Sequence, residues 1–261
     1  MISSFDMTRT NVPFSLPALL AAAFGLGCLA FAAAPARAQA PVVVGTFSAG
    51  RAGGAMPEGW RPLQFQDGLR PTTYALVVDG GAVVMKATSA RSASGLTRQL
   101  TADTRTTPML SWRWKVPATI PGLNERQKNG DDYAARIYVT FAYNPSRLSA
   151  GDRLKYRALR ILGYRDIPVR ALNYVWAGGQ PQGATYWNPF TNWVRMVVVQ
   201  SGASRAGTWV AETRDVAADY RAAFGEDAPP ISGIAIMTDS DNSKKQAEAY
   251  YGDLTLTGRG R

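Results

Sequence analysis

Alternation of apolar and polar residues, which is the period of a β-strand, dominates the sequence. In Leu110–Val116 the apolar side chains share one face and the polar side chains take the other. The segments with this pattern, or with a continuous apolar run, are Leu110–Val116, Ala134–Tyr143, Leu172–Trp176, Trp193–Val199, Ile231–Thr238 and Ala249–Leu256. Asp79-Gly80-Gly81 separates two Val-rich runs and predicts a hairpin turn. Short strands with Gly or Pro between them predict an all-β, antiparallel two-sheet sandwich.

The alternation also predicts which side chains enter the core. The residues expected to point inward include Trp112, Trp114, Trp176, Leu254 and Leu256. Tyr251, Asp253 and Thr255 alternate with the last two and are expected to point outward. Trp193–Val199 is apolar on both faces apart from Arg195, which predicts a strand that is covered on both sides.

Two short segments have helical spacing and predict helices at the periphery of the sandwich. In Ser149–Leu162 an apolar stripe contains Leu154, Ala158, Ile161 and Leu162, and Gly163 is placed to end the helix. Ala217–Phe224 is the second segment, and Gly225 closes it. The narrow stripe of the first helix is expected to pack against one end of the sandwich.

Residues 1–38 have the three parts of a secretory signal peptide. Arg9 supplies the positive start, Leu16–Ala34 is apolar, and Ala36-Arg37-Ala38 offers a cleavage site. Cleavage after Ala40 and retention as a membrane anchor are the alternatives. We expect the signal peptide to be removed, which leaves residues 39–261 as a single β-sandwich domain in the periplasm or outside the cell.

Composition excludes several kinds of chemistry. The chain has no histidine, and its single cysteine, Cys28, lies inside the predicted signal peptide. Disulfides, zinc sites with Cys or His ligands, and Ser–His or Cys nucleophiles are therefore excluded from the mature protein. Lys plus Arg is 29 against 19 for Asp plus Glu, so the protein is basic, with a net charge of +10.

Polar side chains that lie opposite the apolar faces of the strands are candidates for ligand binding. They are Arg113, Lys115, Arg136, Tyr138, Asn173 and Arg195, joined by Trp187 on a turn-like segment and by Asp132, which is expected to orient the guanidinium groups. If these strands are neighbours, the side chains converge into a groove for hydroxylated or anionic ligands. The alternative is an ordinary solvated face on which the arginines pair with acids.

Acidic residues suggest two further kinds of site. Asp239, Asp241 and Asp253 follow a strand or lie close behind it, and crowded carboxylates are typical ligands of Ca²⁺. A structural calcium ion is thus a prediction, and an Asp-rich turn is the alternative. Carboxylate-dependent glycan hydrolysis or lysis is also open, with Asp132, Asp241 and Asp253 as candidate acids, but no spacing selects a pair.

The first predicted helix has a basic edge. Arg153, Arg157 and Arg160 lie at helical spacing beside the apolar stripe. Such a helix can associate peripherally with anionic lipid, which makes a structural envelope protein a third reading. The alternative is a helix that covers the sandwich with a solvated face. Nucleic acid is not expected as a partner, because an exported chain without a recognition motif does not meet it.

Several stretches together resemble DUF3047, a family of exported bacterial proteins of unknown function. They are Leu110–Val116, Gly130–Phe141, Leu172–Ala177, Ile231–Asn242 and Ala249–Leu254, and the likeness extends over roughly Gly45 to Leu256. A fainter resemblance is to galactose-binding-like jelly rolls, the fold of many carbohydrate-binding modules. It is carried by Tyr250–Leu256 near the end and by Thr46-Phe47 and Gly59-Trp60 near the start.

These resemblances imply a jelly-roll-like sandwich, and modules of the second kind often hold a structural calcium ion. Together with the polar strand faces, they favour a non-catalytic binding module for an envelope or extracellular polymer, a glycan with acidic groups. No cofactor is required for such a function, and the oligomeric state is left open.

Overall fold

The structure is a computed structural model that describes residues 40–64, 68–161 and 169–260. By its contacts the chain divides into two units, Met1–Arg37 and Ala38–Arg261. The first unit, which holds most of the predicted signal peptide, lies outside the described residues, as do Leu162 and Gly163.

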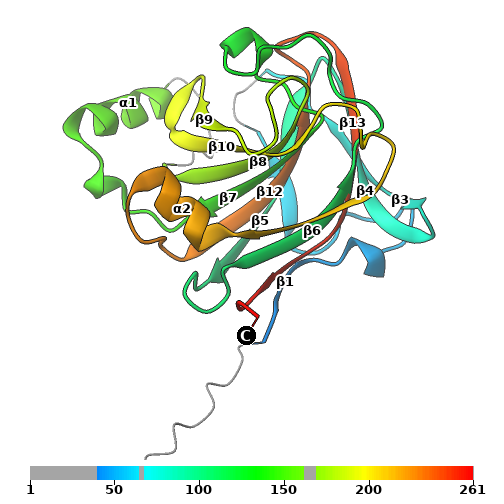
Figure 1. Cartoon of the computed structure of the whole chain (residues 1–261), viewed down its shortest axis with the longest axis horizontal. Coiled ribbons are helices and arrows are strands. Elements are labelled where there is room, and N and C mark those ends of the chain that lie inside the picture. The colour runs from blue at the N-terminus through cyan, green and yellow to red at the C-terminus, as the bar shows by residue number, and fades with distance from the viewer. Residues whose placement is uncertain (1–39, 65–67, 162–168, 261) are drawn as a thin grey trace, which may run out of the picture. The chain divides into compact units, whose positions relative to one another are not determined.

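Strands are the main regular structure of the described chain (Figure 1). They are β1 (Val42–Gly45), β2 (Trp60–Leu63), β3 (Thr73–Asp79), β4 (Ala82–Ala90), β5 (Ala93–Ala102), β6 (Met109–Lys115), β7 (Ala135–Phe141), β8 (Ala171–Ala177), β9 (Thr185–Asn188), β10 (Thr191–Ser201), β11 (Val210–Asp215), β12 (Ile231–Asp239) and β13 (Gln246–Thr257). The helices are α1 (Ala150–Ile161) and α2 (Val216–Phe224), with short 3₁₀ turns at Phe47–Ala49, Lys128–Gly130 and Pro145–Arg147.

The strands form two sheets. The first has the order β11-β6-β13-β4-β3, with β1 also paired to β13, and the second has the order β2-β5-β12-β7-β8-β10-β9. This confirms the predicted all-β, jelly-roll-like sandwich with two short helices. One pair departs from the antiparallel rule, because β8 and β10 run parallel. The chain leaves β8, forms β9 at the edge and returns antiparallel to it as β10, which fills the place between them.

The core lies between the sheets and is rich in aromatic side chains. Trp112, Trp114 and Trp176 are buried, which confirms their prediction as core residues. The rings of Trp112 and Trp114 meet edge to face with centroids 5.5 Å apart, and the centroid of Trp176 is 5.9 Å from that of Trp114. Aromatic pairs of this kind contribute about 0.5–1.5 kcal/mol beyond the burial of their area.

The last strand departs from simple alternation. Leu254 and Leu256 point inward as expected, but Tyr251 is also buried. The register of β13 against β6 shifts between Tyr251 and Leu254, so a bulge adds a residue to the strand. The extra residue reverses the sense of the alternation, and the outward prediction for Tyr251 is therefore wrong.

Local chemistry sets the ends of α2. The Asp215 carboxylate accepts a hydrogen bond of 2.9 Å from the backbone N–H of Ala218, which caps the amino end. Gly225 follows the last turn with a φ of 71°, a left-handed conformation that suits glycine. Between β3 and β4, Gly80 and Gly81 both have positive φ, as a tight hairpin turn requires.

The outer stripe of α1 does not pack as expected. Leu154 is 69% exposed and Ile161 is 85% exposed. The helix instead meets the second sheet through Tyr156, whose ring lies 6.1 Å from that of Trp193 on β10. An aromatic contact on the opposite side of the helix thus sets its orientation, and the apolar stripe faces away. No helix in the described part of the chain is long and apolar enough to cross a membrane.

Candidate functional site

The outward face of the first sheet carries four side chains that alternate cation and aromatic ring. Arg113 and Lys115 come from β6, Tyr250 comes from the adjacent β13, and Trp209 immediately precedes β11. All four are partly exposed. Arg113 and Lys115 point outward because the residues between and beside them, Trp112 and Trp114, fill the core. We refer to these four residues (Arg113, Lys115, Trp209 and Tyr250) as the basic aromatic surface.

Lys115 lies at the centre of this surface. Its ammonium group is 4.5 Å from the centroid of the Tyr250 ring and 5.7 Å from that of Trp209. Asp79, at the end of β3, binds both Lys115 and Trp209. Its carboxylate accepts hydrogen bonds from Lys115 Nζ at 2.5 Å and from Trp209 Nε1 at 2.8 Å. The bond from Lys115 holds the pKa of Asp79 below its usual value, with the bond from Trp209 as a further cause. The ammonium group of Lys115 and the ring of Trp209 are therefore held in place before any ligand arrives.

Arg113 is bound differently from Lys115. Its guanidinium carbon lies 4.7 Å from the centroid of the Trp209 ring, a cation–π contact. Among the described residues it makes no salt bridge within 4.0 Å, so its planar donors are left for another acceptor. A carboxylate accepts two parallel hydrogen bonds from such a group.

Arg136 lies in a different place and in a different environment. It belongs to β7 of the second sheet, and its side chain is 2% exposed. Its Nε donates to Asp239 at 2.7 Å and its Nη2 to the other oxygen of the same carboxylate. Nη1 approaches Asp131 and the hydroxyl of Tyr138 at 3.4 Å each. Arg136 and Tyr138 are therefore part of a buried polar cluster and not of an open groove.

The polar cluster around Arg136 is buried because the outward face of the second sheet is not open to solvent. That face carries a second group of buried apolar side chains, among them Val175, Val194, Met196 and Met237. β10 is accordingly covered on both sides, which confirms the prediction for that strand. Because both faces of the sheet are covered, side chains that alternation placed on a solvated face, Arg136, Tyr138 and Asn173, are buried instead.

The acids of the cluster are engaged as well. Desolvation raises the pKa of Asp131 to about 6, although Arg136 and a 2.8 Å hydrogen bond from Asn188 act in the other direction. Asp132 accepts three hydrogen bonds from Asn242 and Ser243, two of them from backbone N–H groups. Asp132 thus holds the turn after β12 and does not touch the guanidinium group it was expected to orient.

Asn173 occupies the neighbouring position on β8, in register with Tyr138. It is completely buried, and its amide N–H donates to the sulfur of Met196 at 3.5 Å. Within the described residues its Oδ1 has no hydrogen-bond partner. The side chain is therefore part of the covered face and separate from the basic aromatic surface.

The predicted metal ligands are brought together only in part. Oxygen atoms of Asp132, Asp239 and Asp241 lie within 4.8 Å of one another, so Asp132 joins two of the three predicted residues. Burial and the nearby Asp132 carboxylate raise the pKa of Asp241. Asp253 lies elsewhere, where it accepts hydrogen bonds from the backbone and hydroxyl of Ser48.

These donors fit a cation poorly as they stand, because Asp239 is bound by Arg136 and Asp132 by backbone N–H groups. Calcium binding at the remaining residues stays a prediction. The same positions matter for the hydrolase or lyase alternative. Its acids Asp132 and Asp241 are close together, and Asp253 is on the first sheet.

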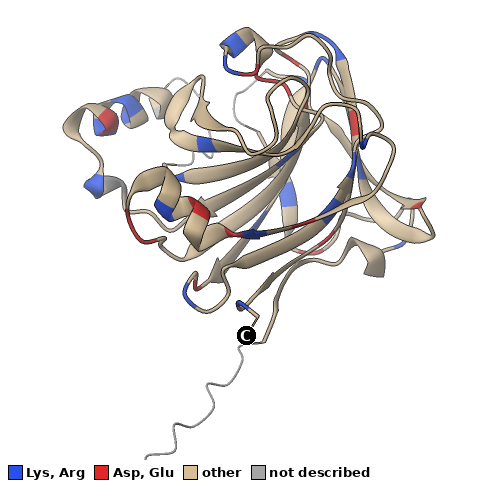
Figure 2. Ribbon diagram, in the orientation of Figure 1, with Lys and Arg blue, Asp and Glu red and all other residues tan. Residues whose placement is uncertain are grey.

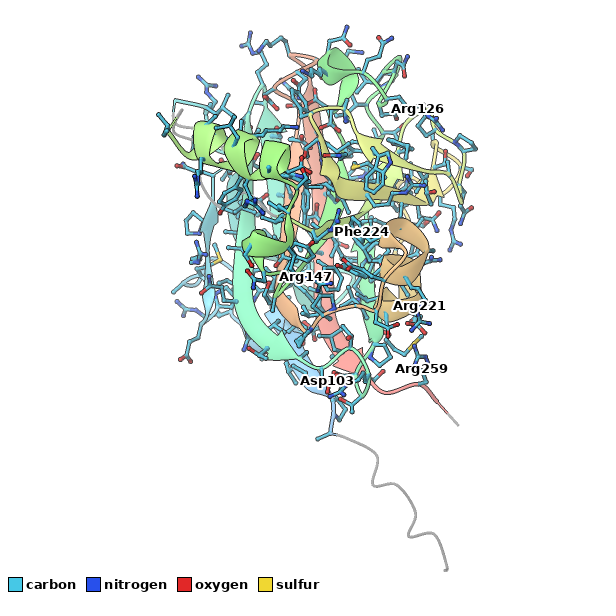
Figure 3. All side chains as sticks on the ribbon, turned by 90° about the vertical axis from the view of Figure 1, so that its left-hand side faces the viewer. Asp103, Arg126, Arg147, Arg221, Phe224 and Arg259 are labelled. Atoms are coloured by element: carbon cyan, nitrogen blue, oxygen red, sulfur yellow. The ribbon has the colours of Figure 1, made fainter. Side chains whose placement is uncertain are left out.

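Arg195 and Trp187 form a third location, at the edge of the second sheet. The two residues are paired across β9 and β10, and the guanidinium carbon lies 4.8 Å from the centroid of the indole ring. Arg195 also donates to the hydroxyl of Thr185 at 2.7 Å. Trp187 is 40% exposed, and its ring lies 5.7 Å from that of Phe224 on α2, which Figure 3 labels.

The predicted binding residues thus occupy three places. Arg113 and Lys115 are together on the first sheet, Arg195 and Trp187 are together at an edge, and the rest are buried. Sequence reasoning missed Trp209, Tyr250 and Asp79. Tyr250 was hidden because the bulge in β13 reverses the alternation around it. The predicted Asp79-Gly80-Gly81 turn could have indicated Asp79, because an aspartate at the end of a strand is placed to bind side chains of the neighbouring strands.

Comparison with solved structures finds carbohydrate-binding modules at low similarity. One is a mutant of the family 29 module CBM29-2 complexed with mannohexaose, with 12% identity, a TM-score of 0.36, and coverage of 85% of this chain and 93% of that one. Another is the family 11 module from Clostridium thermocellum in complex with a β-1,3-1,4-mixed-linked tetrasaccharide, with 8% identity, a TM-score of 0.38, and coverage of 84% and 95%.

A third is the family 11 module of the cellulosomal cellulase Lic26A-Cel5E of Clostridium thermocellum, with 9% identity, a TM-score of 0.37, and coverage of 80% of this chain and 92% of that one. None of the curated proteins matches the chain.

Family comparison gives a more specific result. The family described as "Protein of unknown function (DUF3047)" matches residues 58–255, which include every strand of the second sheet and most of the first. All four residues of the basic aromatic surface lie inside the matched region. The protein therefore belongs to the DUF3047 family.

Proposed function

We propose that the protein is an exported, non-catalytic binding module for an envelope or extracellular glycan with acidic groups, and that the basic aromatic surface binds it. The observation that carries the proposal is the state of Arg113. Its guanidinium group stacks on Trp209 without a salt bridge among the described residues, on the outward face of the first sheet. A cation that stacks on one aromatic ring and has no salt bridge among the described residues suits an anionic sugar.

Each part of the surface has a separate task in this proposal. The rings of Trp209 and Tyr250 offer apolar faces on which pyranose rings stack. Arg113 supplies two parallel hydrogen bonds to a carboxylate or phosphate. Lys115 adds a positive charge near the same sugar, and Asp79 keeps that charge and the indole ring in position. No step of bond cleavage is needed for this function.

Export follows from the predicted signal peptide and places the module where such polymers occur. We propose a periplasmic or secreted location on that basis. Detection of a mature chain that begins near residue 39 in the periplasmic or extracellular fraction tests it, and a full-length chain confined to the cytoplasm contradicts it.

Binding assays on the purified chain test the glycan proposal. An array of acidic and neutral polysaccharides is expected to retain the protein on acidic members. Arg113→Ala and Trp209→Ala should each weaken that binding by about tenfold or more, since loss of one good contact corresponds to about 1.4 kcal/mol.

The chain offers a matched control for these substitutions, because Arg195 and Trp187 form a similar pair on the second sheet. Arg195→Ala and Trp187→Ala are expected to leave the binding unchanged. Binding that survives Arg113→Ala but is lost in Arg195→Ala would move the site to the edge of the second sheet and reject the proposed one.

A further inference from the structure

The outer side of α1 combines exposed apolar and basic side chains. Leu154 and Ile161 have the two largest exposed fractions among the large apolar side chains that are exposed in the described residues, 69% and 85%. They lie seven residues apart with Ala158 between them, so they occupy one stripe of the helix. Figure 1 shows α1 outside the sandwich, next to β9 and β10.

Basic residues border this stripe. Arg157 is exposed next to it, and Arg153, one turn earlier, is exposed while donating to the backbone oxygens of Ser146 and Leu148. Lys155 lies on the other border, 5.2 Å from the centroid of the Trp193 ring. Asp152 is the acid of the helix, and its carboxylate accepts a hydrogen bond from Ser149. The charges are visible in Figure 2.

The opposite side of α1 is already in use. Tyr156 packs against Trp193, and this contact fixes the helix with its stripe turned away from the sheet. Figure 3 views the molecule from the left-hand side of Figure 1, where α1 lies, and labels Arg147, which precedes the helix. Arg147 pairs with Glu226 at 3.3 Å, so its charge is partly compensated. The exposed stripe is therefore a consequence of how the helix docks.

We propose that the outer side of α1 is a docking surface for an anionic lipid bilayer. The stripe would enter the headgroup region while the basic side chains on its borders extend toward lipid phosphates. Two large apolar side chains are too few for a stable protein interface, which buries about 800 Å² on each partner. They are enough for a helix that lies on a surface when cations add electrostatic attraction. This proposal is independent of the glycan site.

Vesicle sedimentation with the full chain tests the proposal. The protein is expected to sediment with vesicles that contain phosphatidylglycerol and to stay in solution with pure phosphatidylcholine vesicles. Raising the salt from about 0.1 M to about 1 M should release it, because the screening length falls from about 10 Å to about 3 Å. Absence of binding to the anionic vesicles at low salt would overturn the proposal.

Two double variants separate the apolar and ionic contributions. Leu154→Gln with Ile161→Gln, and Lys155→Glu with Arg157→Glu, should each lower the partition coefficient by about tenfold or more. Val78→Gln is the apolar control, because Val78 is 64% exposed on β3. Arg51→Glu with Arg221→Glu is the control for net charge. Both controls should bind anionic vesicles nearly as wild type does.

Further outcomes distinguish other occupants of the stripe. Equal binding by wild type and the Leu154→Gln, Ile161→Gln variant would reject the docking surface. Sedimentation equilibrium that shows a dimer, lost in that variant and without vesicle binding, would assign the stripe to a second copy of the chain and also overturn the lipid proposal. Near-ultraviolet circular dichroism verifies that each variant keeps the fold.

Discussion

Gly252 lies directly beneath the side chain of Arg113. A Cβ atom at position 252 would meet Arg113 Cγ at 2.5 Å and Nε at 2.7 Å, which is closer than van der Waals contact allows. The glycine belongs to the bulge of β13, so the irregularity in that strand also makes room for the stacking of Arg113 on Trp209. A single local departure from alternation thus shapes the proposed binding surface.

Gly252→Ala is expected to displace Arg113 from Trp209 and to weaken glycan binding by about tenfold. Unfolding should change little, because a flexible side chain on the surface can move aside. Calorimetric titration with the acidic glycan selected on the array, alongside denaturant unfolding, measures both effects. Unchanged affinity in a well-folded variant would mean that the position of Arg113 does not matter for binding.

Arg136→Met should destabilise the protein strongly. The substitution leaves Asp131 and Asp239 buried without their cation, and breaking a buried pair in this way costs about 3–5 kcal/mol. Lys86→Met is the matched comparison, since Lys86 and Glu248 form a partly exposed pair at 2.8 Å that contributes about 0–1 kcal/mol. Urea unfolding compares the two variants. Equal losses of stability would contradict the role given to Arg136.

The raised pKa of Asp131 is expected to make the free energy of unfolding depend on pH. Its pKa is about 6 in the folded protein against 3.8 for an unperturbed group, so the folded state retains a proton that the unfolded state has lost. This contribution is fully present below pH 3.8 and is lost as the pH rises through about 6. Each unit of pKa shift corresponds to about 1.4 kcal/mol, so the contribution is at most about 3 kcal/mol.

Asp131→Asn removes this titration and keeps the shape of the side chain. The free energy of unfolding of wild type relative to the variant should therefore fall across that pH interval. Urea titrations of both proteins at several pH values measure the difference. Two curves that stay parallel through the interval would show that Asp131 titrates normally.

Trp176 and Trp112 allow one buried hydrogen bond to be measured. Trp176 Nε1 donates to the backbone oxygen of Gly202 at 3.0 Å, whereas Trp112 Nε1 has no partner among the described residues. Trp176→Phe and Trp112→Phe remove the same volume from the core. The first should cost more by about 1 kcal/mol, the net contribution of such a bond, in denaturant unfolding. A smaller loss in Trp176→Phe than in Trp112→Phe would refute this.

Sequence patterns predicted the sheets better than they predicted the site. The alternation in β6 assigns Trp112 and Trp114 to the core and Arg113 outward, because within one strand the period alone decides direction. For Arg136 the same rule gives the direction, but it cannot tell whether that side of the sheet is covered. Whether a face of the sheet is covered depends on segments that are far away in the sequence. The burial of Arg136 could therefore not be predicted from the pattern of its own strand.

Two other differences have similar causes. Tyr251 points inward and Tyr250 outward, the reverse of the expected alternation, because a bulge adds a residue to β13. The sequence pattern does not distinguish a glycine in a bulge from a glycine in a regular strand. The stripe of α1 was expected to be buried because amphipathic helices usually bury their apolar side. Periodicity identifies that side but not which side meets the protein, and here the contact between Tyr156 and Trp193 decides.

The position of β13 has a consequence for synthesis. Among the described strands it is the last in sequence, yet it lies in the middle of the first sheet, between β6 and β4, and it also pairs with β1. A nascent polypeptide that stops short of Gln246 lacks the strand that joins these neighbours, so the first sheet cannot form until β13 has been synthesised. Contacts between segments that are far apart in the sequence are also slow to form. The first sheet is therefore expected to assemble late, after the strands of the second sheet are available.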